Sequence, residues 1–277
     1  MAGERVDGLW ALGRPAVMGI LNLTPDSFSD GGRFDAPGAA LAHAERLLAE
    51  GADVIDVGGE STRPGALPVE AAVEIGRVVP VIAELARRHP EVVLSVDTGK
   101  VAVARAALDA GATMVNDVTA AREEEMLPLV AGRGAGIVLM HMRGEPRTMQ
   151  ADTGYADVVA EVHELLAERA AAAVAAGIAP ARVILDPGIG FGKDLAGNLR
   201  LLRALGDLAA LGHPVAVGAS RKSFLGALTG AAVDDRLPGS LAAVASAAAL
   251  PRVLVRVHDV AATVQFLAVL AAVRSAA

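Results

Sequence analysis

VILDPGIGFGK, residues 183–193, is a short apolar run that ends in a carboxylate, Asp186, and then breaks into proline and three glycines. An apolar run of this length, bounded by proline and glycine, is typical of a buried strand in a parallel sheet. Asp186 is therefore expected at the carboxyl end of a strand, where parallel α/β sheets and barrels form their sites. The glycine spacing, G-x-G-x-G, fits neither a dinucleotide loop nor a P-loop, so no nucleotide site is expected here.

The same order of strand, polar residue and helix recurs along the chain. Strands, each followed by a helical pattern, are predicted at residues 17–21, 54–57, 92–96, 114–115, 137–140, 183–185, 215–217 and 253–257. Eight such units predict an α/β chain folded as a (βα)8 TIM barrel, which typically needs about 250 residues. Long polar loops at 22–32 and 58–66 follow strands 1 and 2, and no linker interrupts residues 1–277, so a single domain is expected. An open, doubly wound parallel sheet is the alternative fold.

The composition excludes several classes of function. The net charge of −7 argues against nucleic acid or an anionic membrane as the main partner, because both require a basic surface. The chain has no cysteine, which excludes disulfides, thiol catalysis and thiolate metal sites. Its start, MAGERVDGLW, lacks the apolar core of a secretory signal, and no apolar tract reaches the roughly 20 residues of a membrane span. We therefore expect a soluble, cytoplasmic protein.

Polar residues follow the predicted strands in all eight units. After one strand, an acid or amide is usually a helix cap or turn residue, but eight strands in succession are hard to explain as capping. The candidates are Asn22, Asp56, Asp97, Asn116, His141, Asp186, Ser220–Lys222, Arg256 and His258. Among them, Asp97, Asn116 and Asp186 provide many acceptors and one donor amide, which suits a flat ligand with a guanidine-like edge.

Cations and aromatic residues near these strand ends indicate further contacts with a ligand. Lys222, Arg256 and His258 come from neighbouring strand ends, which favours an anion such as phosphate over three separate structural ion pairs. Phe28 and Phe191 lie in predicted loops rather than in the core, which favours contact with a ligand. The two long loops are rich in glycine and hydroxyl groups, as closing lids often are.

Eight motifs, in this order, resemble the dihydropteroate synthase family of pterin-binding barrels. They are NLTPDSFSDGG (22–32), IDVGGESTRPG (55–65), SVDT (95–98), NDV (116–118), HMRGEPRTMQ (141–150), LDPGIGFGK (185–193), SRKSFLG (220–226) and RVHDV (256–260). The resemblance spans residues 17 to about 260 and implies a (βα)8 barrel. It also implies that p-aminobenzoate displaces pyrophosphate from 6-hydroxymethyl-7,8-dihydropterin pyrophosphate, giving 7,8-dihydropteroate for folate biosynthesis.

The resemblance further implies roles for individual residues. Asp97, Asn116 and Asp186 would hold the edge of the pterin ring. Lys222 would lie against the ring carbonyl and a ring nitrogen, and Arg256 would stack on the pterin face, as a planar guanidinium can. The catalytic set implied in this way is Asn22, Asp97, Lys222, Arg256 and His258.

Other residues are implied for the pyrophosphate and for the arylamine. The pyrophosphate would be surrounded by Asn22, Arg63, Arg256 and His258. Asn22 would also ligate Mg²⁺, a hard cation held mostly by phosphate and water. The residues framing p-aminobenzoate would be Phe28, Thr62, Pro64, Phe191, Arg221 and Ser223, and Met140 and Gly218 would complete the substrate-binding set. Members of the family are usually homodimers formed through helices late in the barrel, and the apolar segments 225–249 and 260–273 are compatible with that.

Two other functions belong to related pterin-binding proteins. A methyltetrahydrofolate-dependent methyltransferase would share the pterin acids but lack the loops at 22–32 and 58–66 and the SRKS segment. A paralogue that binds pterin without synthase activity would keep the pocket and differ only in loop closure. An assay of pyrophosphate release separates these functions.

Overall fold

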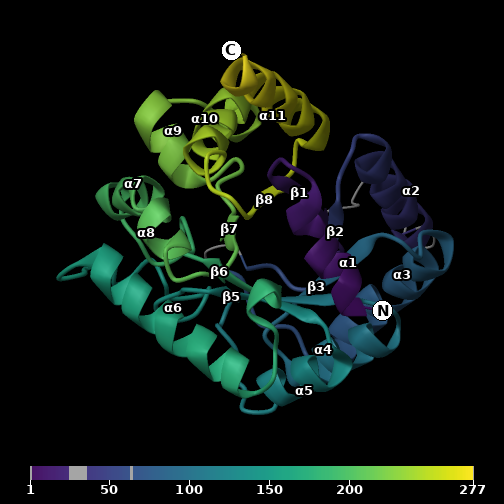
Figure 1. The fold of residues 1–277 in the computed structure, drawn as a ribbon. Helices are drawn as coiled ribbons and strands as arrows, with labels where there is room; N and C mark the ends of the chain where they lie inside the picture. The colour runs from purple at the N-terminus through teal and green to yellow at the C-terminus, as the bar shows by residue number, and fades with distance from the viewer. Residues whose placement is uncertain (1, 25–35, 63–64, 277) are drawn as a thin grey trace.

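A computed structural model describes residues 2–24, 36–62 and 65–276, and in them eight parallel strands close into a barrel. The strands are β1 (Ala16–Asn22), β2 (Val54–Gly58), β3 (Val93–Asp97), β4 (Met114–Asp117), β5 (Gly136–Met140), β6 (Val183–Asp186), β7 (Val215–Val217) and β8 (Val253–Val257). Each strand pairs with the next along the chain, and β8 pairs with β1, which closes the sheet (Figure 1). The predicted barrel is confirmed, and the open doubly wound sheet is wrong.

Helices surround the barrel (Figure 1). They are α2 (Ala36–Ala49), α3 (Ala71–Arg88), α4 (Val101–Asp109), α5 (Met126–Arg133), α6 (Val158–Ala175), α7 (Leu195–Arg203), α8 (Leu205–Ala209), α9 (Ser223–Thr229), α10 (Leu237–Ala247) and α11 (Val260–Ser275). The apolar segment 225–249 contains two helices, because Gly230 ends α9 and Pro238 lies in the first turn of α10. The helical pattern after β6 forms two helices, α7 and α8, which meet at Ala204.

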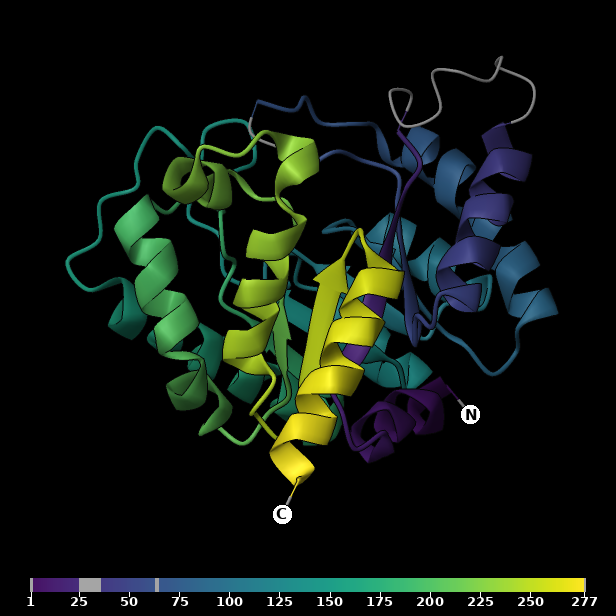
Figure 2. The same cartoon turned by 90° about the horizontal axis from the view of Figure 1, so that it is seen from above.

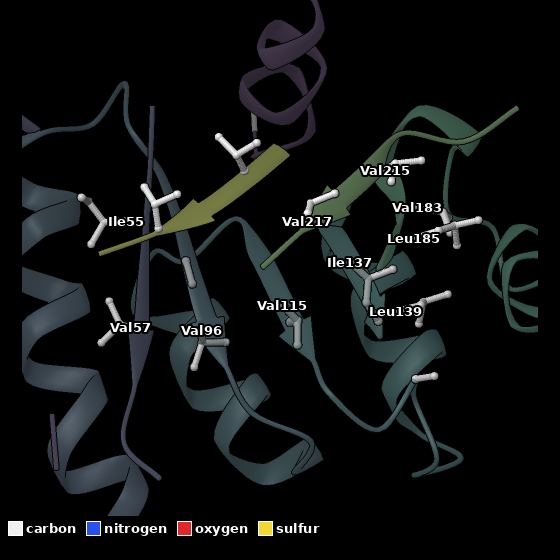
Figure 3. Packing of buried hydrophobic residues seen from close by; sticks show 14 of the residues in the cluster. Ile55, Val57, Val96, Val115, Ile137, Leu139, Val183, Leu185, Val215 and Val217 are labelled. Carbon is white, nitrogen blue, oxygen red and sulfur yellow. The ribbon is translucent and has the colours of Figure 1, made fainter. Parts of the chain in front are cut away.

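Alternate side chains of each strand point outward and pack against these helices. Figure 3 shows part of this layer, including Ile55, Val57, Val96, Val115, Ile137, Leu139, Val183, Leu185, Val215 and Val217. All of them are at most 1% exposed. The strands are short apolar runs because this outer layer is dry along their full length, so the polar residues must face the barrel interior.

A helix that the sequence analysis did not predict covers the end of the barrel where the strands begin. This helix, α1 (Ala2–Gly8), lies beneath the barrel in Figure 2. Val6 and Leu9 pack against the inward-facing residues at that end, which are Ala16, Met18, Val54, Val93, Met114, Val138, Ile184, Ala216 and Leu254. Trp10 Nε1 donates a hydrogen bond to Ala181 O at 2.8 Å. This end of the barrel is therefore a closed apolar core.

Candidate active site

The register of the sheet gathers polar side chains at the opposite end of the barrel interior. Asn22 pairs with Gly58, Gly58 with Asp97, and Asp97 with Asn116 along one row of neighbouring strands. Asp186 pairs with Met140 on the next part of the rim. Because side chains alternate along a strand, these residues share the inward face with the apolar residues of the core below them.

Arg256 of β8 lies at the centre of this group. Its Nε donates to Asp56 Oδ2 and its NH2 donates to Asp97 Oδ2, both at 2.7 Å. Asn116 Nδ2 donates to the same Asp56 oxygen at 3.1 Å. Burial acts to lower the pKa of Arg256, but the carboxylates of Asp56 and Asp97 outweigh it and raise that pKa. The guanidinium is therefore charged and fixed between two acids.

The two acids retain unused acceptors. Among the described residues, Asp56 Oδ1, Asp97 Oδ1 and Ser95 Oγ are buried and have no hydrogen-bond partner. Burial raises the pKa of Asp97 to about 7, with Arg256 opposing the rise and Asp56 adding to it. Buried acceptors are nearly always paired in proteins, and leaving one unpaired costs roughly 1–3 kcal/mol. Unpaired oxygens at the open end of a barrel indicate a place for a ligand's donors.

Asp186 and Lys222 form the other side of the site. Asp186 Oδ1 accepts a hydrogen bond from Gly188 N at 2.7 Å, and burial raises the pKa of this acid against the effect of Lys222. Lys222 Nζ donates to Ile189 O and lies 4.4 Å from the centre of the Phe191 ring. Burial lowers the pKa of Lys222 to about 8. Lys222 thus interacts both with the Phe191 ring and, through its charge, with Asp186.

Gly218 leaves room between these groups. A Cβ at this position would lie 3.8 Å from Lys222 Nζ and 3.9 Å from Asp186 Oδ2, within van der Waals contact of both. Met140, also in the predicted set, is 4% exposed and packs with Met142, Met149 and Val118 in a cluster that Phe191 joins. The structure therefore brings residues from several strand ends together at the mouth of the barrel, as predicted: Met140, Asp186, Phe191, Gly218 and Lys222.

The segment after β7 is tied to the end of β8. Ser220 Oγ lies 3.0 Å from His258 Nδ1 and accepts a hydrogen bond from His258 N at 3.2 Å. Arg221 has a left-handed backbone with φ of 57°, and its guanidinium forms two hydrogen bonds to Asp259, at 3.0 and 2.6 Å. Arg221 was predicted to frame a substrate, but its charged end is occupied by Asp259. Ser223, the first residue of α9, is exposed.

Part of the predicted site lies outside the described residues. Phe28, Arg63 and Pro64 belong to that part. Thr62 is described and is partly exposed, in the first part of the loop that follows β2. A Cβ at Gly58 would lie 3.6 Å from Asn22 Oδ1 and 3.7 Å from Asp97 Oδ2, so Asn22 lies beside the acid group.

Other polar residues at the site were missed or given no role. The sequence analysis placed Asp56 at a strand end but gave it no role. In the structure it accepts a hydrogen bond from Arg256 Nε. Lys100 Nζ contacts Glu60 and, at 2.5 Å, the fully buried Glu74, at the base of the loop after β2. Burial raises the pKa of Glu74. Glu74 breaks the apolar face of its helix in sequence, and that was the signal available to find it.

The sequence and fold of the chain were compared with those of known proteins. The pterin binding enzyme family matches residues 18–258. The dihydropteroate synthase of Escherichia coli strain K12 is 46% identical over 265 residues, which cover 96% of this chain and 94% of that protein. The chain belongs to this family of pterin-binding dihydropteroate synthases. The family's activity, synthesis of 7,8-dihydropteroate in folate biosynthesis, is accordingly the activity of this enzyme.

Solved structures agree with this placement. The dihydropteroate synthase of Xanthomonas albilineans with 4-aminobenzoic acid has a TM-score of 0.89 and 51% identity, covering 95% of this chain and 94% of that chain. A second structure of the synthase from this organism, in complex with 7,8-dihydropteroate, has a TM-score of 0.86 and 48% identity, with 95% of each chain covered. In the part of the chain that the structure describes, no helix is long and apolar enough to span a membrane.

Proposed function

We propose that the polar end of the barrel holds the pterin by its hydrogen-bonding edge. The observation that carries this is the set of buried, unpaired acceptors beside Arg256. Asp97 Oδ1 has no partner among the described residues, and Asn116 lies next to it in the sheet. Carboxylates accept parallel N–H bonds from a guanidine-like edge, which the pterin ring provides. Asp186 completes this set of acceptors from β6.

Lys222 supplies hydrogen-bond donors in this proposal, whereas the acids supply acceptors. Among the described residues it is the cation that lowers the pKa of Asp186 most, and Gly218 places no side chain beside the two groups. An ammonium supplies only donors, so it matches the ring carbonyl and an unprotonated ring nitrogen. Its pKa of about 8 keeps most of it charged at neutral pH. We assign Lys222 to the pterin carbonyl side.

The chemistry asks the protein to stabilise a leaving group rather than to supply a nucleophile. Loss of pyrophosphate leaves a methylene cation that the dihydropterin ring delocalises, and the neutral arylamine then attacks that carbon. Arg256 stays charged between its two acids, beside the pterin site, and we assign it with His258, Asn22 and Arg63 to the pyrophosphate. We also assign Arg256 to stack on the face of the pterin ring, as a planar guanidinium can. Neutralising the anion, orienting the amine and excluding water are the enzyme's tasks.

Magnesium is the cofactor that fits this site. Among the described residues, no group of three histidine, cysteine or acidic side chains could hold a metal. A single amide oxygen at Asn22, with phosphate and water as the remaining ligands, is a donor set that Mg²⁺ accepts. When bound, Mg²⁺ would neutralise the pyrophosphate. We propose Asn22 as its protein ligand.

The arylamine is proposed to bind next to Phe191. This ring is already held over Lys222, on the rim that also carries Ser223 and Thr62. Phe28 and Pro64 remain proposed members of the same pocket, and Arg221 flanks it through its pairing with Asp259. A sulfonamide resembles p-aminobenzoate in shape and charge, so we expect it to compete for this pocket.

We also propose that one pterin-binding domain accounts for the chain and that the enzyme is a cytoplasmic homodimer. Val269 and Val273 of α11 are 60% and 68% exposed, and Leu228 of α9 is 51% exposed. Large exposed apolar side chains on helices late in the barrel are typical of a subunit interface. Light scattering coupled to size-exclusion chromatography measures the mass in solution, and a 28.0 kDa species would contradict the dimer.

Pyrophosphate release with both substrates and Mg²⁺ tests the proposed function. The expected result is release that requires p-aminobenzoate and is inhibited competitively by a sulfonamide. Pterin binding without release would identify a non-catalytic paralogue. Transfer of a methyl group from methyltetrahydrofolate would identify the methyltransferase instead.

A further inference from the structure

Residues 188–192 form a loop in which each backbone carbonyl accepts a hydrogen bond from a side chain. The pairs are Gly188 O and Phe191 O with Lys193 Nζ, Ile189 O with Lys222 Nζ, Gly190 O with Gln150 Nε2 and Gly192 O with Tyr155 Oη. A loop normally directs most of its carbonyls to water or to its own backbone. This loop is therefore held by side chains, and Lys193 alone holds two of its carbonyls.

Lys193 is buried on the inner side of the loop. Its side chain is 3% exposed, and its Nζ lies 2.9 Å from Gly188 O and 2.8 Å from Phe191 O. Two further acceptors belong to His141 at the end of β5: the carbonyl oxygen at 3.2 Å and Nδ1 at 3.1 Å. The charged lysine only donates, so His141 Nδ1 is then an acceptor, and three N–H groups are shared among the four acceptors. Burial lowers the pKa of His141 to about 3, in keeping with a neutral ring.

The loop packs tightly against the end of β5. Gly188 has φ of 69°, and a Cβ there would lie 1.9 Å from His141 O, so no side chain can stand at this position. Gly188 N donates to Asp186 Oδ1 at 2.7 Å, while Phe191 stands over Lys222 three residues further on. Asp186, just before the loop, is proposed to bind the pterin. Phe191, near the end of the loop, is proposed to bind the arylamine.

We propose that Lys193 is a positioning residue for the condensation: its ammonium ties the carbonyls of residues 188 and 191 to the end of β5 and so fixes the Asp186 carboxylate relative to the Phe191 ring. The inference rests on the proposed roles of Asp186 and Phe191. The lysine after a glycine-rich loop here faces the loop's own carbonyls, in contrast to the lysine of a P-loop. It sets the spacing between the pterin and arylamine pockets.

A purely structural role explains the geometry less well. Burial lowers the pKa of Lys193 to about 7, with Asp186 opposing this effect and Lys222 and Arg143 adding to it. A buried ammonium is costly compared with an apolar side chain of similar size, so a lysine is a poor choice for stability alone. What it provides is three directed N–H groups at one point.

The test compares Lys193→Met with the wild-type enzyme. Methionine keeps the length of the side chain and removes all its donors, so the Asp186–Phe191 spacing loses its anchor. We expect the KM for p-aminobenzoate to rise tenfold or more and pterin affinity, measured by calorimetry, to fall severalfold.

Two control variants separate positioning from general loss of stability. Tyr155→Phe removes a single bond to the loop and should change both constants less than twofold. Val6→Ala opens a cavity at the far end of the barrel and lowers the melting temperature without touching the loop. A folded Lys193→Met enzyme whose constants match those of Val6→Ala would overturn the proposal.

A chemical rescue covers the case in which Lys193→Met does not fold. The chain has no native cysteine, so Lys193→Cys can be alkylated at one position with 2-bromoethylamine in denaturant and then refolded. The thioether product again carries an ammonium at nearly the same distance. Recovery of both substrate constants supports positioning by Lys193, whereas recovery of the fold without the constants overturns it. Wild-type protein without synthase activity would instead refute the proposed function.

Discussion

The two ends of the barrel use the same faces of the same strands for opposite purposes. Where the strands begin, inward-facing residues such as Met18, Met114 and Ile184 are at most 1% exposed and pack under α1. Two residues later on β4 and β6, the inward positions carry Asn116 and Asp186. The apolar core and the polar site are therefore only two residues apart along these strands.

The ends differ also in how their acids are satisfied. Asp53, before β2, accepts two hydrogen bonds from Arg14, at 2.7 and 2.8 Å, and one from Val17 N at 2.8 Å. Asp56, three residues later, leaves Oδ1 unpaired, as Asp97 does. A paired acid stabilises the fold, whereas a buried acceptor without a partner marks the place where a ligand completes the hydrogen bonding. The comparison predicts that the two ends respond separately to mutation.

The largest expected effect is on stability at the apolar end. Met114→Ala removes a fully buried side chain and should lower the free energy of unfolding by about 2–5 kcal/mol, because surrounding residues only partly fill the cavity. Denaturant unfolding measures this change. Pterin affinity of the folded fraction should stay within twofold of wild type, and a larger loss would show that the two ends are coupled.

The next effect is on binding at the polar end. Asp186→Ala leaves ligand N–H groups without an acceptor and should weaken pterin binding by roughly 1–3 kcal/mol or more, which is about fivefold to over a hundredfold. Calorimetry with a pterin ligand measures it. Asp53→Ala is the matched control: it removes an acid from the other end and should lower stability while preserving affinity. Equal affinities for Asp186→Ala and wild type would remove Asp186 from the site.

The sequence predicted the fold because its signals are local. Each strand is a short apolar run with glycine or proline nearby, and all eight were found within a few residues, with their polar ends. Helix α1 was not predicted, because it has seven residues, three of them charged, and of these only Val6 joins the apolar core, together with Leu9 just after the helix. Its role depends on the closed barrel and not on its own pattern.

Hydrogen bonds between residues far apart in the chain could not be predicted from the sequence either, because they also depend on the closed barrel. Arg256 and Asp56 are 200 residues apart, and Lys193 and His141 are 52 apart. Side-chain types and strand ends indicated which residues meet at the mouth, but not which ones bond to each other. Arg221 illustrates the limit, since its bond to Asp259 depends on the left-handed backbone of the turn.

A third prediction concerns pH at the polar end. Asp97 accepts a ligand N–H most strongly when ionised, so pterin affinity should fall as pH drops below its pKa of about 7, by at most tenfold, or about 1.4 kcal/mol, per pH unit. Stability should change in the opposite direction. Because the folded pKa lies above the ordinary aspartate value of 3.8, the unfolded state binds fewer protons between these limits, and this acid's contribution to stability decreases as pH rises from about 4 to 7.

Calorimetry at several pH values, with Asp97→Asn as the control, tests both statements. The asparagine variant should bind weakly with little further change across this range, and its stability relative to wild type should increase from pH 4 to 7. A wild-type affinity that stays constant from pH 7 to 5 would contradict the assigned role of Asp97.

The smallest effect is expected at Trp10, in the turn that follows the helix closing the apolar end. Trp10→Phe keeps most of the ring packed and removes only the hydrogen bond from Nε1 to Ala181 O. A neutral hydrogen bond contributes about 0.5–1.5 kcal/mol, and the low end applies here because Trp10 is partly exposed and water can reach the freed carbonyl. For a domain of this size the melting temperature should fall by roughly 1–4 °C. Substrate constants should not change, because the bond lies at the opposite end of the barrel from the site. A fall much larger than this, or a rise in the KM for either substrate, would mean that α1 supports the polar end as well and that the two ends are not independent.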